Sequence, residues 1–111
     1  MSAEAIAAVE RMFAAANRGD WAAAEEIFAP DFRSHPLGTT GVGPIRDSWR
    51  RMFEQFPGLR VAPQRMIADG DRVAVWSTIE NMPGTPQIME LIRVADGKVA
   101  EVWALREHPD R

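Results

Sequence analysis

The sequence predicts an α+β domain in which a cone-shaped, curved antiparallel sheet of about four long strands wraps around three N-terminal helices. Three observations carry this prediction. Apolar residues recur at helical spacing in the first half of the chain, the spacing becomes strand-like from Leu59 onward, and an Asp96-Gly97 pair folds the last third into a hairpin. Helices followed by a run of strands are typical of domains whose helices cover one face of a sheet.

Three amphipathic segments account for the helices. The first is expected over residues 2–17, with Gly19 as its C-terminal stop. A second, shorter helix is expected from Asp20, which can cap it, to Pro30, which ends it. The third opens at Gly43-Pro44 and closes at Pro57-Gly58, because proline is tolerated in a first turn and glycine favours a helix end.

The segment between the second and third helices, residues 31–42, is rich in turn-forming residues and is expected to be irregular. Strand-like sequence follows over residues 59–67, where Pro63 indicates an edge position or a bulge. Residues 72–80 are apolar on both faces, as expected of a central strand.

The hairpin over residues 87–107 organises the rest of the chain. Asp-Gly between apolar runs favours a type I′ turn, in which both central residues adopt positive φ. A regular ladder from this turn would place Glu90 opposite Trp103 and Glu101 diagonally beside them on one face. The other face would carry Met89, Leu91, Arg93, Ala100, Val102, Ala104 and Arg106.

Composition excludes several classes of function. The chain has 111 residues with 46% hydrophobic and 26% charged residues, which is the composition of one globular domain. A net charge of −3 without a basic patch argues against nucleic acid or an anionic membrane as a partner. The absence of cysteine and the presence of only two histidines argue against a metal site. The N-terminal segment has neither signal-peptide nor membrane-span character, so a cytoplasmic location is the default expectation.

Four strings resemble the SnoaL-like polyketide cyclase family of the nuclear transport factor 2-like superfamily, which has a cystatin-like fold. They are DWAAAEEIFAPDFRSH, GPIRDSWRRMFEQFPGLR, ADGDRVAVWSTIE and MELIRVADGKVAEVW. Their order and spacing span nearly the whole chain, so the resemblance implies a single SnoaL-like domain over residues 1–111. The superfamily includes cyclases, isomerases, hydrolases, dehydratases and non-catalytic binding modules, so the resemblance constrains function less than fold.

The resemblance also implies three site residues. The family places a histidine shortly after the second helix, a tryptophan on the last strand and an acid/base carboxylate four positions beyond it. The matching residues are His35, Trp103 and Glu107, with glutamate in place of the more usual aspartate. The absence of tyrosine excludes a tyrosine oxyanion hole of the ketosteroid isomerase kind.

The residues themselves single out Glu90, which interrupts an apolar strand. A carboxyl group enclosed by apolar side chains has its charged form desolvated, which raises its pKa and suits proton transfer. Glu101 on the same face would raise it further, although an outer face with Glu90 paired to an arginine is the alternative. Glu107 would lie on the order of 13 Å from Glu90, too far for the two to act as one dyad.

A sheet wrapped around helices leaves an open mouth that can bind a small hydrophobic ligand. The side chains expected to line this pocket are Phe32, Trp49, Phe53, Trp76 and Trp103. The opposite sheet face, with Met89, Leu91, Val102 and Ala104, would leave an apolar patch that a homodimer could cover.

Three hypotheses follow. The first is a cyclase or isomerase without metal or organic cofactor, in which His35 with Glu90 or Glu107 moves a proton next to a carbonyl. The second is a non-catalytic ligand-binding or dimerisation module with the same fold. The third is epoxide hydrolase or dehydratase chemistry, which needs a carboxylate within hydrogen-bond reach of a histidine or an arginine.

Overall fold

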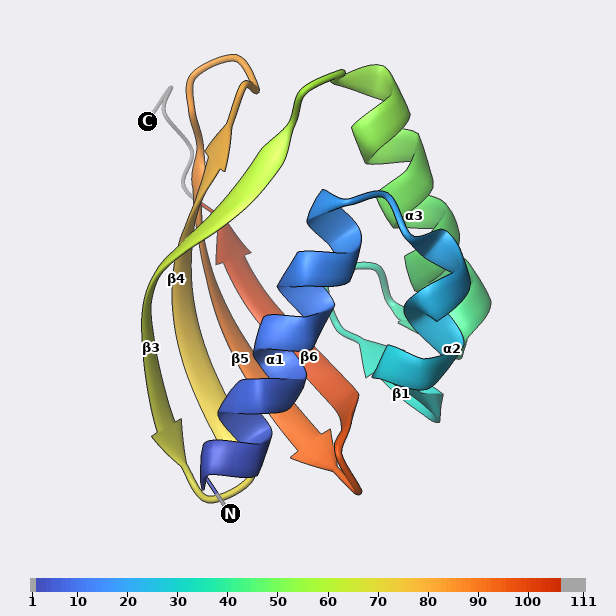
Figure 1. Ribbon diagram of the computed structural model, residues 1–111, viewed down its shortest axis with the longest axis vertical. Coiled ribbons are helices and arrows are strands. Elements are labelled where there is room, and N and C mark those ends of the chain that lie inside the picture. Colours follow the sequence, from blue (N-terminus) through green and yellow to red (C-terminus); the bar gives the residue numbers. More distant parts are fainter. Residues whose placement is uncertain (1, 107–111) are drawn as a thin grey trace.

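Helices and one mixed sheet make up the computed structural model, which describes residues 2–106 (Figure 1). The sheet has six strands in the order β2-β1-β6-β5-β4-β3. Strands β3 to β6 are antiparallel neighbours, whereas β1 runs parallel to β6. The elements are α1 (Ser2–Asn17), the 3-10 turn η1 (Trp21–Ala23), α2 (Ala24–Ile27), β1 (Phe28–Ser34), β2 (Thr39–Thr40), α3 (Val42–Gln55), β3 (Arg60–Asp69), β4 (Arg72–Glu80), β5 (Gln87–Ala95) and β6 (Lys98–Arg106).

The long helix α1 lies across the concave face of the sheet (Figure 1). It buries Val9 and Phe13 against strand residues that include Val75 and Ile92. Its C-terminal end is tied to the edge strand β3, because the Asn17 side-chain amide donates to the Val61 carbonyl oxygen at 2.8 Å and accepts from the Val61 N–H at 2.9 Å. These contacts hold the helix end over the sheet.

The α+β fold class is confirmed, but two strands were missed. The expected second helix is only the turn η1 and one turn of α2, and the chain enters β1 at Phe28. Segment 31–42 was expected to be irregular, yet β1 continues through Ser34 and pairs with β6 in parallel. The sheet is therefore mixed rather than purely antiparallel, because β1 pairs in parallel with β6 at the edge of the antiparallel strands.

Asp20 stands at the start of η1 as expected, but its side chain makes no capping hydrogen bond. The predictions for Pro63, the central strand and the Asp96-Gly97 turn are confirmed. Pro63 lies on the edge strand β3 beside a register shift, and β4 is an interior strand between β3 and β5. The Asp96-Gly97 turn has φ values of 52° and 75°, as a type I′ turn requires.

The predicted register of the last hairpin is wrong beyond its first two pairs. Val94 lies opposite Val99 as expected, but Arg93 then pairs with Glu101 and leaves Ala100 as an extra residue on β6. This bulge moves every later residue of β6 by one position and so exchanges its faces. Glu90 consequently lies opposite Ala104 instead of Trp103.

Because of this bulge, the residues on each face of the hairpin differ from those predicted. Glu101 and Trp103 share the outer, convex face with Met89 and Leu91, whereas the concave face carries Glu90, Val102 and Ala104. Val102 and Ala104 were expected in the outer apolar patch, but they lie on the concave face instead.

Candidate functional site

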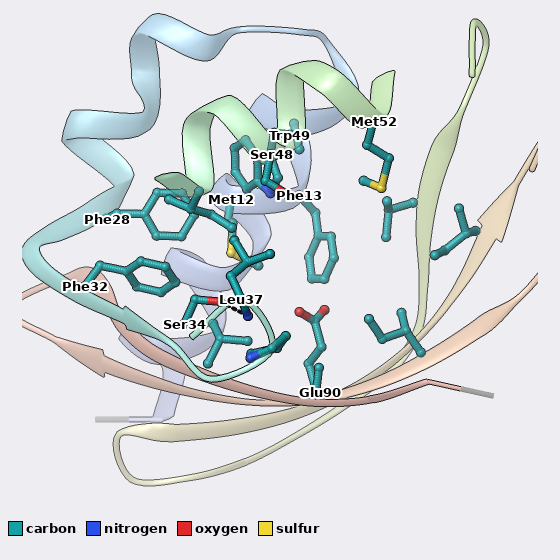
Figure 2. Close-up of a pocket in the computed structure, with 18 of the residues that line it drawn as sticks. Met12, Phe13, Phe28, Phe32, Ser34, Leu37, Ser48, Trp49, Met52 and Glu90 are labelled. Carbon is teal, nitrogen blue, oxygen red and sulfur yellow. Dashed lines mark hydrogen bonds between the residues drawn. The ribbon is translucent and has the colours of Figure 1, made fainter. Parts of the chain in front are cut away.

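A cavity of about 200 Å³ lies between the concave face of the sheet and the helices α1 and α3 (Figure 2). Most of its lining is apolar. Phe13 contributes from α1, Phe32 from β1, and Trp49 and Phe53 from α3. Among the described residues of the lining, the side chains that carry hydrogen-bonding groups are Ser34, Ser48, Glu90 and Trp49, whose indole N–H can only donate.

The aromatic wall is an interlocked set rather than separate rings. Phe28 packs on Phe32 at a centroid distance of 4.5 Å and meets Trp49 edge-on at 5.1 Å. Trp21 then packs on Phe53 at 5.6 Å, so the turn η1 supports α3 from behind. Such contacts hold the rings in defined orientations and give the cavity a fixed shape.

Glu90 is the one charged side chain in the lining, and its carboxyl group points into the cavity toward Phe13 (Figure 2). The residue is partly buried and lines the cavity. Within residues 2–106 the carboxyl group has no hydrogen-bond or ion-pair partner. Burial in these apolar surroundings raises the pKa of Glu90 from 4.5 to about 7, since the charged form loses its hydration.

Strand alternation explains why Glu90 reaches the cavity. Its neighbours Met89 and Leu91 are exposed on the outer face at 48% and 39%, so Glu90 must point inward. The residue opposite it on β6 is Ala104, whose small side chain leaves space above the carboxyl group.

A second polar cluster lies on the outer face of the same hairpin. The His35 Nε2–H donates to the Glu101 carboxylate at 2.6 Å, and the Arg93 Nε–H donates to its other oxygen at 3.1 Å. The hydrogen bond from His35 is the main cause that lowers the pKa of Glu101, and Arg93 adds to it. The His35 ring also stacks on Trp103 at 4.8 Å with an interplanar angle of 10°.

The predicted site residues therefore separate into two groups. Phe32, Trp49, Phe53 and Glu90 line the cavity together. His35, Trp76 and Trp103 lie on the outer face, so the structure does not bring His35 together with Glu90 and does not place these two indoles in the cavity wall. Glu107 falls outside the described residues.

The outward positions of His35 and Trp76 both follow from strand alternation. In β1 the side chains of Phe32 and Ser34 are buried, so the next residue, His35, points to the opposite face. In β4 Val75 and Ser77 are buried, so Trp76 between them is 43% exposed, where its indole N–H donates to the Gln87 side chain.

Sequence reasoning missed the contribution of β1 and α1 to the cavity. Ser34 was not recognised as a pocket residue because residues 31–42 were expected to be irregular. The alternation that points Phe32 and Ser34 to the same face could have indicated a strand there. Met12 and Phe13 line the cavity from α1, a helix from which no pocket residue had been expected.

Two further features of the described chain bear on function. Residues 2–106 contain no group of three or more histidine, aspartate or glutamate side chains that could hold a metal ion. No helix in this range is long and apolar enough to cross a membrane.

Comparison with solved structures shows the fold. A proposed polyketide cyclase, protein SMa1630 from Sinorhizobium meliloti, is 25% identical with a TM-score of 0.78, over 88% of this chain and 93% of that one. A proposed SnoaL-like polyketide cyclase from Jannaschia sp. CCS1 is 21% identical with a TM-score of 0.82, over 96% and 88% of the two chains. A SnoaL-like protein of unknown function from Burkholderia thailandensis is 19% identical with a TM-score of 0.79, over 97% and 98%.

No curated protein matches the sequence. The sequence profile of the SnoaL-like domain matches residues 9–102, which is most of the chain. This match confirms the resemblance carried by the four strings. The chain therefore belongs to the SnoaL-like domain family.

Proposed function

We propose that this chain is a cofactor-independent enzyme of the cyclase or isomerase type that moves a proton next to a carbonyl group of a small hydrophobic ligand. The observation that carries the proposal is the carboxyl group of Glu90, which lies in an apolar cavity without a partner among the described residues and has a pKa of about 7. A group with a pKa near neutrality exists in both protonation states at working pH, so it can take a proton and return it.

The proposed reaction uses the Glu90 carboxylate as the base. It takes a proton from the carbon next to the carbonyl group, the electron pair of the broken C–H bond forms a C=C bond, and the carbonyl π pair moves onto oxygen. The same carboxyl group then returns the proton to that carbon or to another carbon of the conjugated system. His35 has no part in this step, because it lies on the outer face of the sheet.

Proton exchange tests the proposal without knowledge of the natural substrate. Cyclohexanone and acetophenone are incubated with the protein in D₂O, and loss of the α-proton signals is followed by NMR. We expect the protein to accelerate exchange over buffer and Glu90→Gln to lower the accelerated rate by about 10²-fold or more.

Glu101→Gln is the matched control, since it removes a carboxylate from the outer face of the same hairpin. It should leave the exchange rate unchanged. A wild-type rate no faster than buffer, or a Glu90→Gln rate equal to wild type, would contradict proton transfer by Glu90.

The second candidate is a non-catalytic binding module. It is favoured by the apolar lining of the cavity, which would bind a hydrophobic ligand whatever the role of Glu90. This candidate predicts that the same ketones raise the unfolding temperature without exchange, and that Glu90→Gln still binds them. The histidine–carboxylate pair needed for epoxide or dehydration chemistry is formed by His35 and Glu101, on the outer face and away from the cavity.

We also propose that the outer face forms a homodimer. Its exposed and partly exposed apolar side chains lie in two rows across the strands, Trp103–Leu91–Ala74–Ile67 and Leu105–Met89–Trp76. A monomer does not normally leave so continuous an apolar surface in water. Sedimentation should show a dimer, and Leu91→Glu should shift it toward monomer, whereas a wild-type monomer at high concentration would exclude this interface.

A further inference from the structure

The Ser34 hydroxyl group accepts a hydrogen bond within the fold but donates none to a described residue. The residue is 3% exposed, and its Oγ accepts a hydrogen bond from the Leu37 N–H at 3.2 Å (Figure 2). A hydroxyl group can also donate one hydrogen bond, and the Ser34 hydrogen has no acceptor within residues 2–106. Buried donors normally have partners, so this one points to a ligand atom in the cavity it lines.

Ser34 and Glu90 face each other across the floor of the cavity. Ser34 on β1 pairs with Val102 on β6, and Glu90 on β5 pairs with Ala104 on β6. The two Cα atoms are therefore two strands and two residues apart, which is about 12 Å. Both side chains rise from the concave face toward the same space (Figure 2), so a small molecule can contact both at once.

The charge of the lining restricts the ligand. Glu90 is the only charged side chain among the described residues that line this cavity, and none of those residues is an arginine, lysine or histidine. A ligand carboxylate would therefore meet the Glu90 charge with no cation to offset it, in surroundings where like charges repel strongly. The cavity favours an uncharged ligand.

The volume restricts the ligand further. Drug-sized ligands occupy pockets of about 300–1,000 Å³, whereas an apolar cavity of about 150 Å³ holds one benzene ring. At about 200 Å³ this cavity has room for one ring with a short substituent, or for two compact rings. A ligand of three or more fused rings would extend beyond it.

We propose that the cavity takes an uncharged ketone of one or two rings, whose oxygen accepts a hydrogen bond from the Ser34 hydroxyl group while Glu90 faces the adjacent carbon. This inference rests on the proposed function and names its ligand class and oxygen-binding residue. When Glu90 takes the α-proton, negative charge develops on the ketone oxygen, and a donor already aimed at that oxygen stabilises it. The Leu37 N–H polarises the Ser34 hydroxyl group and strengthens its donation.

The test compares two ligands of nearly equal shape. Acetophenone carries a carbonyl oxygen where α-methylstyrene carries a CH₂ group, and benzoate carries a charge. We expect Ser34→Ala to weaken acetophenone binding about tenfold by NMR titration and to leave α-methylstyrene binding unchanged. Benzoate should bind the wild-type protein at least about tenfold more weakly than acetophenone near pH 8.

Thr78→Val is the matched control, since it removes a hydroxyl group from β4 at a residue that does not line the cavity, and it should change neither affinity. Ser34→Cys covers the case in which Ser34→Ala fails to fold, because it replaces a strong donor with a weak one at nearly the same volume. An unchanged ratio of acetophenone to α-methylstyrene affinity in the Ser34 variants would overturn the role of Ser34. An equal loss of affinity for both ligands leaves that ratio unchanged and so overturns it too. Failure of acetophenone to bind the wild-type protein would overturn the ligand class.

The α-proton exchange of acetophenone separates this inference from the proposed function. Ser34→Ala should slow exchange at saturating ketone by at least about tenfold, beyond its effect on affinity. Exchange that depends on Glu90 but not on Ser34 would refute the inference and leave the proposed function standing. A carbonyl preference that depends on Ser34, with no exchange in the wild-type protein, would refute the proposed function and leave oxygen binding by Ser34 in place.

Discussion

Replacing Glu90 by glutamine should change the pH dependence of stability in a direction that can be calculated. The pKa of Glu90 is about 7 in the folded protein, against 4.5 when the group is fully hydrated. Between these values the unfolded chain has released the proton that the folded chain still holds. The free energy of unfolding therefore falls as pH rises through this window.

The size of the change follows from the two pKa values. Their difference is about 2.5, and each pKa unit corresponds to about 1.36 kcal/mol, so the full effect is about 3 kcal/mol. The contribution of Glu90 is fully present below pH 4.5 and is lost once pH exceeds about 7. Glutamine cannot ionise, so Glu90→Gln should lack this loss and be the more stable protein above neutral pH.

Urea denaturation followed by tryptophan fluorescence, at pH values from about 5 to 8, measures both proteins. The stability difference in favour of Glu90→Gln should grow by about 2.5 kcal/mol across this range, because part of the full effect is already present at pH 5. Glu101→Gln is the control with opposite sign. The lowered pKa of Glu101 means that its carboxylate stabilises the fold above its ordinary pKa, and that this stabilisation is lost as pH falls. A difference between wild type and Glu90→Gln that stays constant with pH would refute the burial of an isolated carboxyl group.

Three further measurements test the faces and supports of the sheet. Ile92→Ala should cost about 2–5 kcal/mol in denaturation because Ile92 is fully buried, whereas Leu91→Ala on the outer face should cost much less; equal losses would contradict the assigned faces. Asn17→Ala should cost about 1–3 kcal/mol because it leaves the Val61 backbone groups without partners, and a loss near zero would show that water replaces both bonds. If Glu90 is the base, the ketone exchange rate should rise with pH and level off above about 7, and a rate that falls through this range would exclude a carboxylate base.

Sequence reasoning succeeded where the determining chemistry is local. The Asp96-Gly97 turn was predictable because few residue pairs adopt positive φ at both positions. The strand at β4 was predictable from its own residues, and Glu90 could be singled out because a carboxyl group interrupts an apolar run.

Sequence reasoning failed where the local structure depends on residues that are distant in the sequence. β1 is held by β6, some seventy positions later, and its proline and charged residues obscure the inward positions of Phe32 and Ser34. Val99 and Ala100 are both small and apolar, so nothing in the residues marks Ala100 as a bulge, and both are in fact buried. Family position alone could not place His35, because its side depends on the strand that precedes it.

The bulge at Ala100 decides the chemistry of both faces. In a regular ladder the Trp103 indole would lie opposite Glu90 and fill the space above it, and Glu101 would be a second carboxylate nearby. With the extra residue, Ala104 lies opposite Glu90, and Glu101 moves to the face where it accepts hydrogen bonds from His35 and Arg93. The two carboxyl groups therefore lie on opposite faces of one hairpin. The pKa of Glu90 is raised because the group is isolated in an apolar cavity, and the pKa of Glu101 is lowered because the group is hydrogen-bonded.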